Sequence, residues 1–305
     1  MSSKSVFVCG ATGTQGGALT NQLLDKGINV NAITRDINSS QAQHLISRGV
    51  SLTQGDFDDE ECLKHAMANC TSFFLNLPPD FTKPTGELDQ ARKILSVAKQ
   101  SGVRHVIYTS ALGANNPEQL PHWTPSGLIG MLLLSKQAIE KEVKAAGFET
   151  WTILRPGNFM SNFLDPLVRM YQGLVETRKF TTAFLPQTIL PMIDPNDIGK
   201  FAAAAIVEPS KFNHREVETV SQMMTVEDLV KDLSMATGKD IEMCFLSEED
   251  IAAQLPTNPV LGPQKVMRDM SLLVDMEYVR SWGIKLETFA GFLEREKQRV
   301  DMTYM

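Results

Sequence analysis

The sequence predicts an α/β fold, in which a doubly wound parallel sheet is joined by a smaller, mainly helical cap. Three observations carry this prediction. Short apolar runs alternate with amphipathic stretches through the first half of the chain, a glycine-rich segment directly follows the first apolar run, and the alternation weakens beyond residue 156. Strands and helices that alternate at this spacing pair in parallel through right-handed crossovers, so helices should cover both faces of the sheet.

The elements follow in order along the chain. We expect strands at residues 5–9, 29–34, 50–54, 72–77, 105–109 and 150–154, with helices between them near 15–26, 40–48, 59–68, 86–101 and 131–146. A further strand is expected at 188–193 and a helix at 195–207, followed by helices near 225–237, 247–254, 265–281 and 286–301. This pattern predicts a first domain over residues 1–155, with 188–208 returning to it, and a substrate-binding cap in the remainder of 156–305.

Composition excludes several classes of function. The 305 residues include 29 basic and 36 acidic side chains, a net charge of −7, which disfavours direct nucleic-acid binding because phosphate is repelled. The longest nearly apolar run, Leu128–Leu134, is far shorter than the ~20 residues that cross a bilayer. The four cysteines lack metal-finger spacing, and the N-terminus lacks the apolar stretch of a signal peptide. We therefore expect reduced thiols, no metal site, no membrane association and a cytoplasmic or nuclear protein.

The glycine-rich segment is the strongest functional signal. It reads Gly10-Ala-Thr-Gly-Thr-Gln-Gly16-Gly, a GxxGxxG pattern between the first strand and the first helix. Glycines here permit a tight turn, let the backbone approach a pyrophosphate and allow close packing of helix on strand. The first helix then offers amide donors to the anion. The pattern predicts a Rossmann-like dinucleotide site, and its expected contacts are Gly10, Thr12, Gly13, Thr14, Gln15 and Gly16.

The end of the second strand bears on the choice of dinucleotide. A carboxylate at this position binds the 2′-hydroxyl of NAD, whereas an arginine pairs with the 2′-phosphate of NADP. The sequence has Thr34-Arg35-Asp36, so both side chains are present. We favour NADP(H) bound by Arg35. The alternatives are that Asp36 selects NAD, or that Arg35 is a solvated arginine paired with Asp36.

Two further segments follow strands of the predicted sheet. Asp56 and Phe57 come after the third strand, and Asn76 and Leu77 lie at the end of the fourth. Because ligands bind at the carboxyl ends of strands in open α/β sheets, we expect Asp56 and Phe57 near the adenine and the Asn76–Pro79 segment beside the ribose. Asp56 has an equally good alternative role, which is to cap the helix that begins near residue 58.

Lys136 stands out on the helix predicted at 131–146. Around the helix axis, at 100° per residue and with Leu132 at zero, Ile139 falls at −20° and Lys136 at +40°, both on the apolar side. Lys141 falls at 180°, on the opposite side. A lysine on the sheet-facing side either extends outward to water or meets a ligand. We expect Lys136 to bind the nicotinamide ribose or to serve in acid–base chemistry, although Glu140, one turn later, is a possible ion-pair partner.

The chain resembles the short-chain dehydrogenases/reductases in this helix and the strand before it. Those enzymes use a serine after the strand and a Tyr-x-x-x-Lys pair on the helix; Ser110 and Lys136 match, but Leu132 stands where the tyrosine would be. A closer resemblance, over nearly the whole chain, is to the NmrA-like family of atypical short-chain dehydrogenases/reductases. It rests on Val8–Gly17, Ala32–Arg35, Gln54–Asp59, Leu154–Pro156 and the Lys136 helix, which are specific in combination.

This resemblance implies two classes of function. Some members resemble nitrogen-metabolite regulators and NADPH sensors that act through protein partners, while related reductases use the helix lysine without the tyrosine. We favour an NADP(H)-dependent oxidoreductase of a small, largely apolar organic substrate, with Lys136 and Ser110 catalytic. The alternative is a non-catalytic NADP(H)-sensing regulator with a protein partner.

The segment after the sixth strand is expected at the nicotinamide end of the site. Pro156, Asn158 and Phe159 are the predicted contacts there, and Phe180 and Phe184 would add an apolar wall for the substrate. The alternative is that these aromatic residues form the core of the cap. His122, in the segment before the Lys136 helix, is a candidate proton donor or lid residue, with plain solvent exposure as the alternative.

Overall fold

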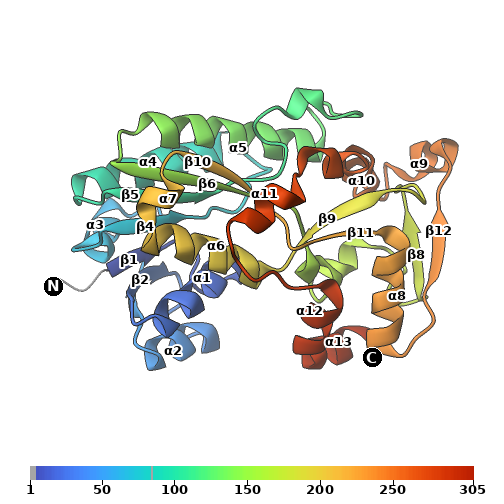
Figure 1. The fold of residues 1–305 in the computed structure, drawn as a ribbon, viewed down its shortest axis with the longest axis horizontal. Helices are drawn as coiled ribbons and strands as arrows, with labels where there is room; N and C mark the ends of the chain where they lie inside the picture. The colour runs from blue at the N-terminus through green and yellow to red at the C-terminus, as the bar shows by residue number, and fades with distance from the viewer. Residues whose placement is uncertain (1–4, 84) are drawn as a thin grey trace. The chain divides into compact units, whose positions relative to one another are not determined.

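The computed structural model describes residues 5–83 and 85–305. The chain forms two compact units (Figure 1). The first contains the residues up to Ala114, Leu132–Arg155 and Pro195–Thr219, and the second contains Asn115–Met131, Pro156–Asp194 and Val220–Met305. Each unit is described in turn.

A seven-stranded sheet forms the centre of the first unit. Its strands are β1 (Ser5–Val8), β2 (Asn29–Thr34), β3 (Ser51–Gln54), β4 (Ser72–Leu75), β5 (His105–Thr109), β6 (Thr150–Pro156) and β10 (Arg215–Thr219), in the order β10-β6-β5-β4-β1-β2-β3. From β3 through β1 and β4 to β6, all neighbouring strands are parallel. The strand order reverses between β1 and β4, which creates a topological switch point. The predicted doubly wound parallel sheet is confirmed.

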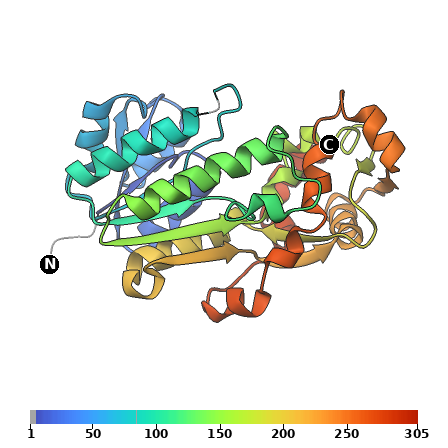
Figure 2. The same cartoon turned by 90° about the horizontal axis from the view of Figure 1, so that it is seen from above.

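Helices cover both faces of this sheet. On one face, α3 (Glu60–Met67), α4 (Gly86–Gln100) and α5 (Leu128–Ala145) enclose a core that contains Phe7, Phe73 and Tyr108. In both views α4 and α5 run side by side (Figure 1 and Figure 2). On the other face lie α1 (Thr14–Asp25) and α6 (Pro195–Val207), which pack against each other. Their contact is close because a Cβ on Gly199 would lie 2.7 Å from the carbonyl carbon of Ala18.

Local sequence signals fix the remaining elements of this unit. Ser39 caps α2 (Ser40–Ser47) by accepting a hydrogen bond from the Ala42 amide, and Asp59 caps α3 through the Cys62 amide. The six strands and five helices expected before residue 156 are confirmed, with ends that differ by three residues at most.

The edge strand β10, and the short helix α7 (Pro209–Phe212) before it, were not expected. The sequence of β10, Arg-Glu-Val-Glu-Thr, is rich in charged residues, unlike the buried strands. Val217 and Thr219 are nevertheless buried, whereas Glu216 and Glu218 are partly exposed. This alternation of buried and partly exposed side chains is typical of an edge strand. The charged residues make the strand difficult to predict from the sequence.

The second unit combines two small sheets with short helices. One sheet has the order β11-β9-β7 and the other pairs β12 with β8. The strands are β7 (Asn158–Phe159), β8 (Lys179–Thr182), β9 (Ile189–Ile193), β11 (Gln222–Thr225) and β12 (Glu242–Phe245). The strand expected at 188–193 therefore exists as β9, but it pairs with β7 and β11 instead of returning to the first domain. Of residues 188–208, those from Pro195 onward, which form α6, belong to the first unit.

In the second unit, the helices expected near 225–237 and 247–254 are confirmed, whereas the two longer ones are divided into shorter helices. The helices of this unit are η2 (Met160–Phe163), η3 (Leu167–Met170), α8 (Val226–Thr237), α9 (Glu248–Gln254), α10 (Leu261–Met267), η4 (Met270–Leu273), α11 (Met276–Ser281), α12 (Phe289–Arg295) and α13 (Lys297–Tyr304), with η1 (Pro117–Gln119) in the earlier segment. The continuous helices predicted at 265–281 and 286–301 are wrong. Asp275 accepts backbone hydrogen bonds as an N-cap and starts α11, which interrupts the first of them. The second starts after its N-cap, Thr288, and is interrupted at Glu296, between α12 and α13.

Candidate functional site

The glycine loop lies between β1 and α1 in the first unit. Gly10 adopts a positive φ of 66°, a backbone conformation that favours glycine. A Cβ on Gly16 would lie 2.3 Å from the carbonyl oxygen of Gly10, so no other residue fits there without a shift of backbone. The Gly13 amide donates to the Gly10 carbonyl at 2.8 Å and closes the turn. The loop thus brings α1 against the end of β1, and Gly10, Gly13 and Gly16 add no side chain of their own between these elements.

The start of α1 offers hydrogen-bond donors. Its N-cap, Gly13, has no capping side chain, and the first turn contains no acidic residue. The amides of the first helical turn have no acceptor within the helix, and the helix dipole adds positive potential there. Thr12, Gly13 and Thr14 are exposed. This combination suits an anionic group such as a phosphate.

Gln15 connects the glycine loop to two neighbouring strands. Its Nε2 donates to Oδ1 of Asn76 at 3.2 Å, and its Oε1 accepts from the Thr109 hydroxyl at 2.6 Å. Asn76 follows β4 and Thr109 ends β5, so the contacts join the carboxyl ends of β1, β4 and β5. Asn76 also limits Gly10, because its Nδ2 would lie 3.3 Å from a Cβ there. Gln15 and Asn76 are among the contacts predicted from the sequence, whereas Thr109 is not.

Arg35 and Asp36, at the end of β2, differ in their surroundings. The Asp36 carboxylate accepts a hydrogen bond from the Asn38 amide at 2.9 Å, and its carbonyl accepts from the hydroxyls of Thr34 and Ser39. Asp36 is thus engaged in its own turn. Arg35 is exposed and makes neither an ion pair nor a hydrogen bond to any residue that the structure describes. The alternative in which Arg35 pairs with Asp36 is wrong.

The segment after β3 is also shaped by a local turn. The Asp56 carboxylate accepts from the Asp58 amide at 2.8 Å, while the cap of α3 is Asp59, which accepts from Cys62 at 2.9 Å. The alternative role of Asp56 as the cap of this helix is therefore wrong, because the cap lies three residues later, at Asp59. Phe57 is half-buried and packs against the core of the first unit.

Lys136 is buried on α5 beside the ends of two other elements. Its Nζ donates to Oε1 of Glu87 at 2.5 Å and to the carbonyl of Leu77 at 3.1 Å. The side chains of Lys136 and Glu87 are only 7% and 2% exposed. The Ser135 hydroxyl donates to the second carboxylate oxygen of Glu87 at 2.9 Å. The predicted sheet-facing orientation is confirmed, but the ion-pair partner is Glu87, on the first turn of α4, and not Glu140.

Tyr108 lies close to this ion pair. Its ring centroid is 5.9 Å from Nζ of Lys136, and its hydroxyl is buried. Burial, together with the charges of Glu87 and Glu140, raises the pKa of Tyr108 well above its usual value. Tyr108 is therefore neutral at physiological pH.

Ser110 and Glu140 belong to a second buried cluster. The Ser110 hydroxyl donates to Glu140 at 2.6 Å, and Glu140 accepts two hydrogen bonds from Arg155, at 2.9 and 2.7 Å. Arg155 also pairs with Glu216 and Glu218 of β10. Burial alone would lower the pKa of Arg155, but the carboxylates of Glu140 and Glu216 outweigh it and raise the pKa. Ser110 thus contacts a structural ion cluster, while Lys136 contacts a different carboxylate.

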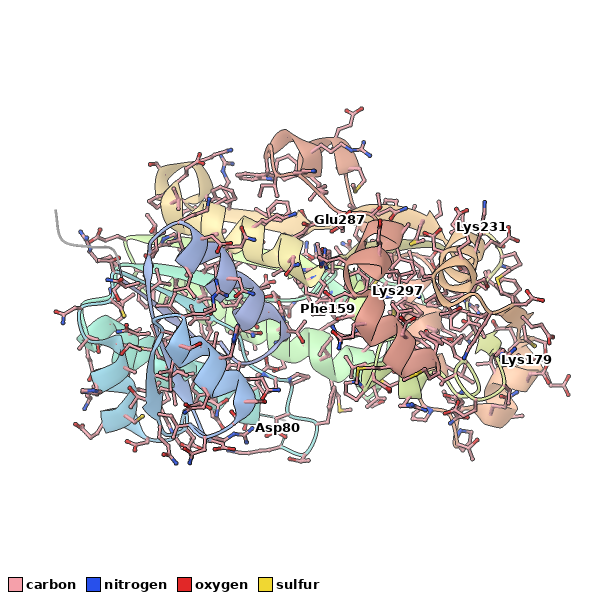
Figure 3. All side chains as sticks on the ribbon, turned by 90° about the horizontal axis from the view of Figure 1, so that it is seen from below. Asp80, Phe159, Lys179, Lys231, Glu287 and Lys297 are labelled. Atoms are coloured by element: carbon pink, nitrogen blue, oxygen red, sulfur yellow. The ribbon has the colours of Figure 1, made fainter. Side chains whose placement is uncertain are left out.

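The other expected contacts belong to the second unit. Pro156 is buried; Asn158 and Phe159, in β7, are half-buried. Asn158 accepts a hydrogen bond from Asn162 at 3.1 Å. Figure 3 shows Phe159 on the opposite side of this unit from Lys179 and Lys231. His122 is exposed and has a positive φ of 62°. A common site for these residues and Lys136 stays a prediction.

The aromatic residues expected as a substrate wall lie in the core of the second unit. Phe180 and Phe184 are 0% and 2% exposed. Phe163 stacks on Tyr171 with ring centroids 4.9 Å apart and meets Phe180 edge-on at 6.3 Å. The core interpretation is therefore the one that the structure supports for these side chains.

Among residues 5–83 and 85–305, no helix is long and apolar enough to span a bilayer. The same residues contain no group of three or more His, Cys, Asp and Glu side chains placed to hold a metal ion.

Comparisons with known proteins agree with this geometry. The model of the NmrA-like family matches residues 2–288. An NmrA-like family domain-containing oxidoreductase of Cladobotryum sp is 29% identical over 255 residues, which cover 77% of this chain and 74% of that protein.

Two solved structures share the fold. An NADPH-dependent quinone oxidoreductase of Escherichia coli, complexed with NADPH, has a TM-score of 0.75 at 22% identity and covers 95% of this chain and 99% of its own. NmrA, a negative transcriptional regulator in complex with NAD, has a TM-score of 0.69 at 17% identity and covers 100% and 96% of the two chains. The glycine loop, the sheet order and the family match together lead to one conclusion: the chain belongs to the NmrA-like family.

Proposed function

We propose that this protein is an NADP(H)-dependent oxidoreductase that acts on a small, largely apolar organic substrate. The observation that carries the proposal is the glycine loop, where the exposed Gly13 and the first turn of α1, which has neither a capping side chain nor an acidic residue, form one surface. That surface fits a pyrophosphate, and the relatives named as oxidoreductases support redox chemistry. A bound reduced nicotinamide would supply the hydride.

Arg35 supports the phosphorylated form of the cofactor. Its guanidinium is exposed, whereas the Asp36 carboxylate already accepts the Asn38 amide. An arginine in this state can pair with a 2′-phosphate, while the carboxylate would first have to leave its turn to bind a 2′-hydroxyl. The residues proposed to bind the rest of the cofactor are Gly10, Thr12–Gly16, Asp56, Phe57, Asn76 and Leu77, with Pro156, Asn158 and Phe159 from the second unit.

Lys136 is the residue proposed to assist proton transfer. It lies at the carboxyl end of the sheet through its bond to the Leu77 carbonyl, and Leu132 stands four residues before it on α5. Ser110 and His122 are weaker candidates, because Ser110 donates to Glu140 and His122 belongs to the other unit. A substrate that accepts a hydride readily needs little help from a protein acid.

The regulator alternative keeps one specific observation. The proton-donating tyrosine of the short-chain reductases is replaced by Leu132, and NmrA, which shares the fold, is named a negative transcriptional regulator. In that role the same cofactor site would report NADP(H) occupancy to a protein partner.

A fluorescence titration tests the proposal. The chain has three tryptophans, whose quenching can be followed as NADPH, NADP⁺ and NADH are added. We expect tighter binding of the phosphorylated forms, and Arg35→Ala should weaken NADPH about tenfold while leaving NADH unchanged. NADPH oxidation is then assayed with a quinone and an azo dye as acceptors. Equal binding of NADH and NADPH would transfer the specificity to Asp36, and no binding of either would overturn the proposal.

A further inference from the structure

The ammonium group of Lys136, on α5, is held by groups from two other segments. Glu87 comes from the first turn of α4, and the Leu77 carbonyl comes from the segment after β4. The distances are 2.5 Å to Glu87 and 3.1 Å to Leu77. Both charged side chains are almost completely buried. A buried ion pair of this kind fixes both partners, because neither can be solvated elsewhere at low free energy.

The direction of the remaining N–H bond follows from these contacts. A lysine ammonium has three N–H donors. Glu87 and the Leu77 carbonyl accept two of them, and no described residue accepts the third. Glu87 is itself fixed, since its other oxygen accepts from the Ser135 hydroxyl at 2.9 Å. The third N–H of Lys136 therefore has one direction, although the lysine side chain is long and flexible.

Holding α4 against α5 does not require this buried pair. The two helices share an apolar core that includes Ile94 and Ile139. They are also joined at the surface by an ion pair between Arg92 and Glu142, with 2.6 Å between the charged atoms. Replacing a buried ion pair with apolar side chains is often neutral or stabilising, so packing alone does not account for a carboxylate at position 87.

We propose that Glu87 is the positioning residue for Lys136, and that it directs the third N–H of the ammonium toward the bound cofactor. This inference rests on the proposed function, because that N–H needs a ligand to meet. Ser135 contributes by holding Glu87. Glu87 acts only through Lys136 and contacts no ligand itself.

The experiment compares Glu87→Gln with Glu142→Gln. Both variants neutralise a carboxylate that pairs α4 with α5, but only the first lies at Lys136. Two quantities are measured: the rate at which an amine-acylating reagent labels Lys136 in the nucleotide-free protein, followed by mass spectrometry, and the affinity for NADPH. For Glu87→Gln we expect about tenfold faster labelling of Lys136 and about tenfold weaker NADPH binding. Glu142→Gln should change neither.

The outcomes separate this inference from the proposed function. Wild-type protein that does not bind NADPH would overturn the proposed function and the inference with it. Wild-type protein that binds NADPH, beside a Glu87→Gln variant that binds it equally well, would overturn the inference alone. If Glu87→Gln does not fold, Ser135→Ala replaces it, since this change keeps the ion pair but releases one side of Glu87. Ser135→Ala should shift both quantities in the same direction by a smaller factor, and unchanged values would refute the positioning role.

Discussion

At the scale of single residues, Gly16 is the position where one added carbon has the largest effect on the candidate site. Its Cβ would lie 2.3 Å from the Gly10 carbonyl oxygen and 2.7 Å from that of Cys9, and both neighbours are backbone atoms that cannot rotate away. We expect Gly16→Ala to move α1 away from β1, to lower the melting temperature and to abolish NADPH binding. Thermal unfolding and the tryptophan titration measure both effects.

A matched control is available on another helix. Gly262, in α10, has room for a Cβ, whose nearest neighbour would be a Leu255 methyl group at 3.6 Å. Gly262→Ala should therefore fold normally and bind NADPH like the wild type. If Gly16→Ala also behaved like the wild type, the close approach at the glycine loop would not be needed for binding.

Residue-scale prediction from sequence succeeded where the signal is local. Helical periodicity placed Lys136 on the sheet-facing side of its helix, and the structure buries it there. The same periodicity could not identify Glu87, which lies 49 residues earlier on a separate helix. The nearest carboxylate along the helix, Glu140, pairs with Arg155 instead. Ion pairs between distant segments depend on tertiary packing, which a local pattern does not contain.

At the scale of elements, Arg155 joins three parts of the first unit. It extends from the end of β6 to Glu140 of α5 and to Glu216 and Glu218 of β10. The side chains of Arg155 and Glu140 are each 3% exposed. Arg155→Met would leave Glu140 buried without its cation, so we expect a loss of about 3–5 kcal/mol in the free energy of unfolding, measured by chemical denaturation.

The exposed ion pair between Arg92 and Glu142 provides the comparison. It joins α4 and α5 at the surface, with side chains 54% and 34% exposed. Arg92→Met should cost at most about 1 kcal/mol, because solvent screens the pair. Similar losses for Arg92→Met and Arg155→Met would show that burial does not strengthen the Arg155 cluster.

The same cluster predicts a dependence of stability on pH. Burial would raise the pKa of Glu216, but Lys144 and Arg155 outweigh it and lower the pKa below its usual value of 4.5. A carboxylate with a lowered pKa in the folded state stabilises the protein fully above the unfolded value, and this contribution is lost as pH falls through the folded value. We expect Glu216→Gln to flatten the decline in unfolding free energy below pH 4.5. If the unfolding free energy of Glu216→Gln declined with falling pH as steeply as that of the wild type, this prediction would be contradicted.

Element-scale prediction from sequence was strong in the first unit and weak in the second. Buried parallel strands such as β1 and β5 are continuous apolar runs, which stand out against the amphipathic helices around them. In the second unit, β8 and β12 are four residues each and mix polar and apolar residues, so neither forms an apolar run. Such short strands form through long-range pairing, as between Lys179 and Glu242, so their own sequences identify them poorly.

At the scale of the whole molecule, the candidate cofactor contacts divide unequally between the two units. The glycine loop, Arg35, Asn76 and Lys136 belong to the first, whereas Pro156, Asn158 and Phe159 belong to the second. The anion-binding features described for the glycine loop and for Arg35 thus lie within one unit. Family membership predicted from the sequence is confirmed over residues 2–288, but it does not decide between turnover and sensing.

A cofactor that binds the folded protein alone stabilises it against unfolding. NADPH at one hundred times its dissociation constant should stabilise the folded protein by about 2.7 kcal/mol and raise its melting temperature, whereas Gly16→Ala should show no such increase. Amide exchange should slow at residues 10–16 and 34–39, where the dinucleotide is proposed to bind. If NADPH also altered exchange in α8 and β12 of the second unit, while the quinone and dye acceptors gave no turnover, the regulator alternative would be favoured. Slower amide exchange confined to the proposed contacts, together with NADPH oxidation that depends on an acceptor, would instead favour the oxidoreductase. The reason is that catalysis requires only occupancy of the site, whereas a sensor must transmit that occupancy to a surface.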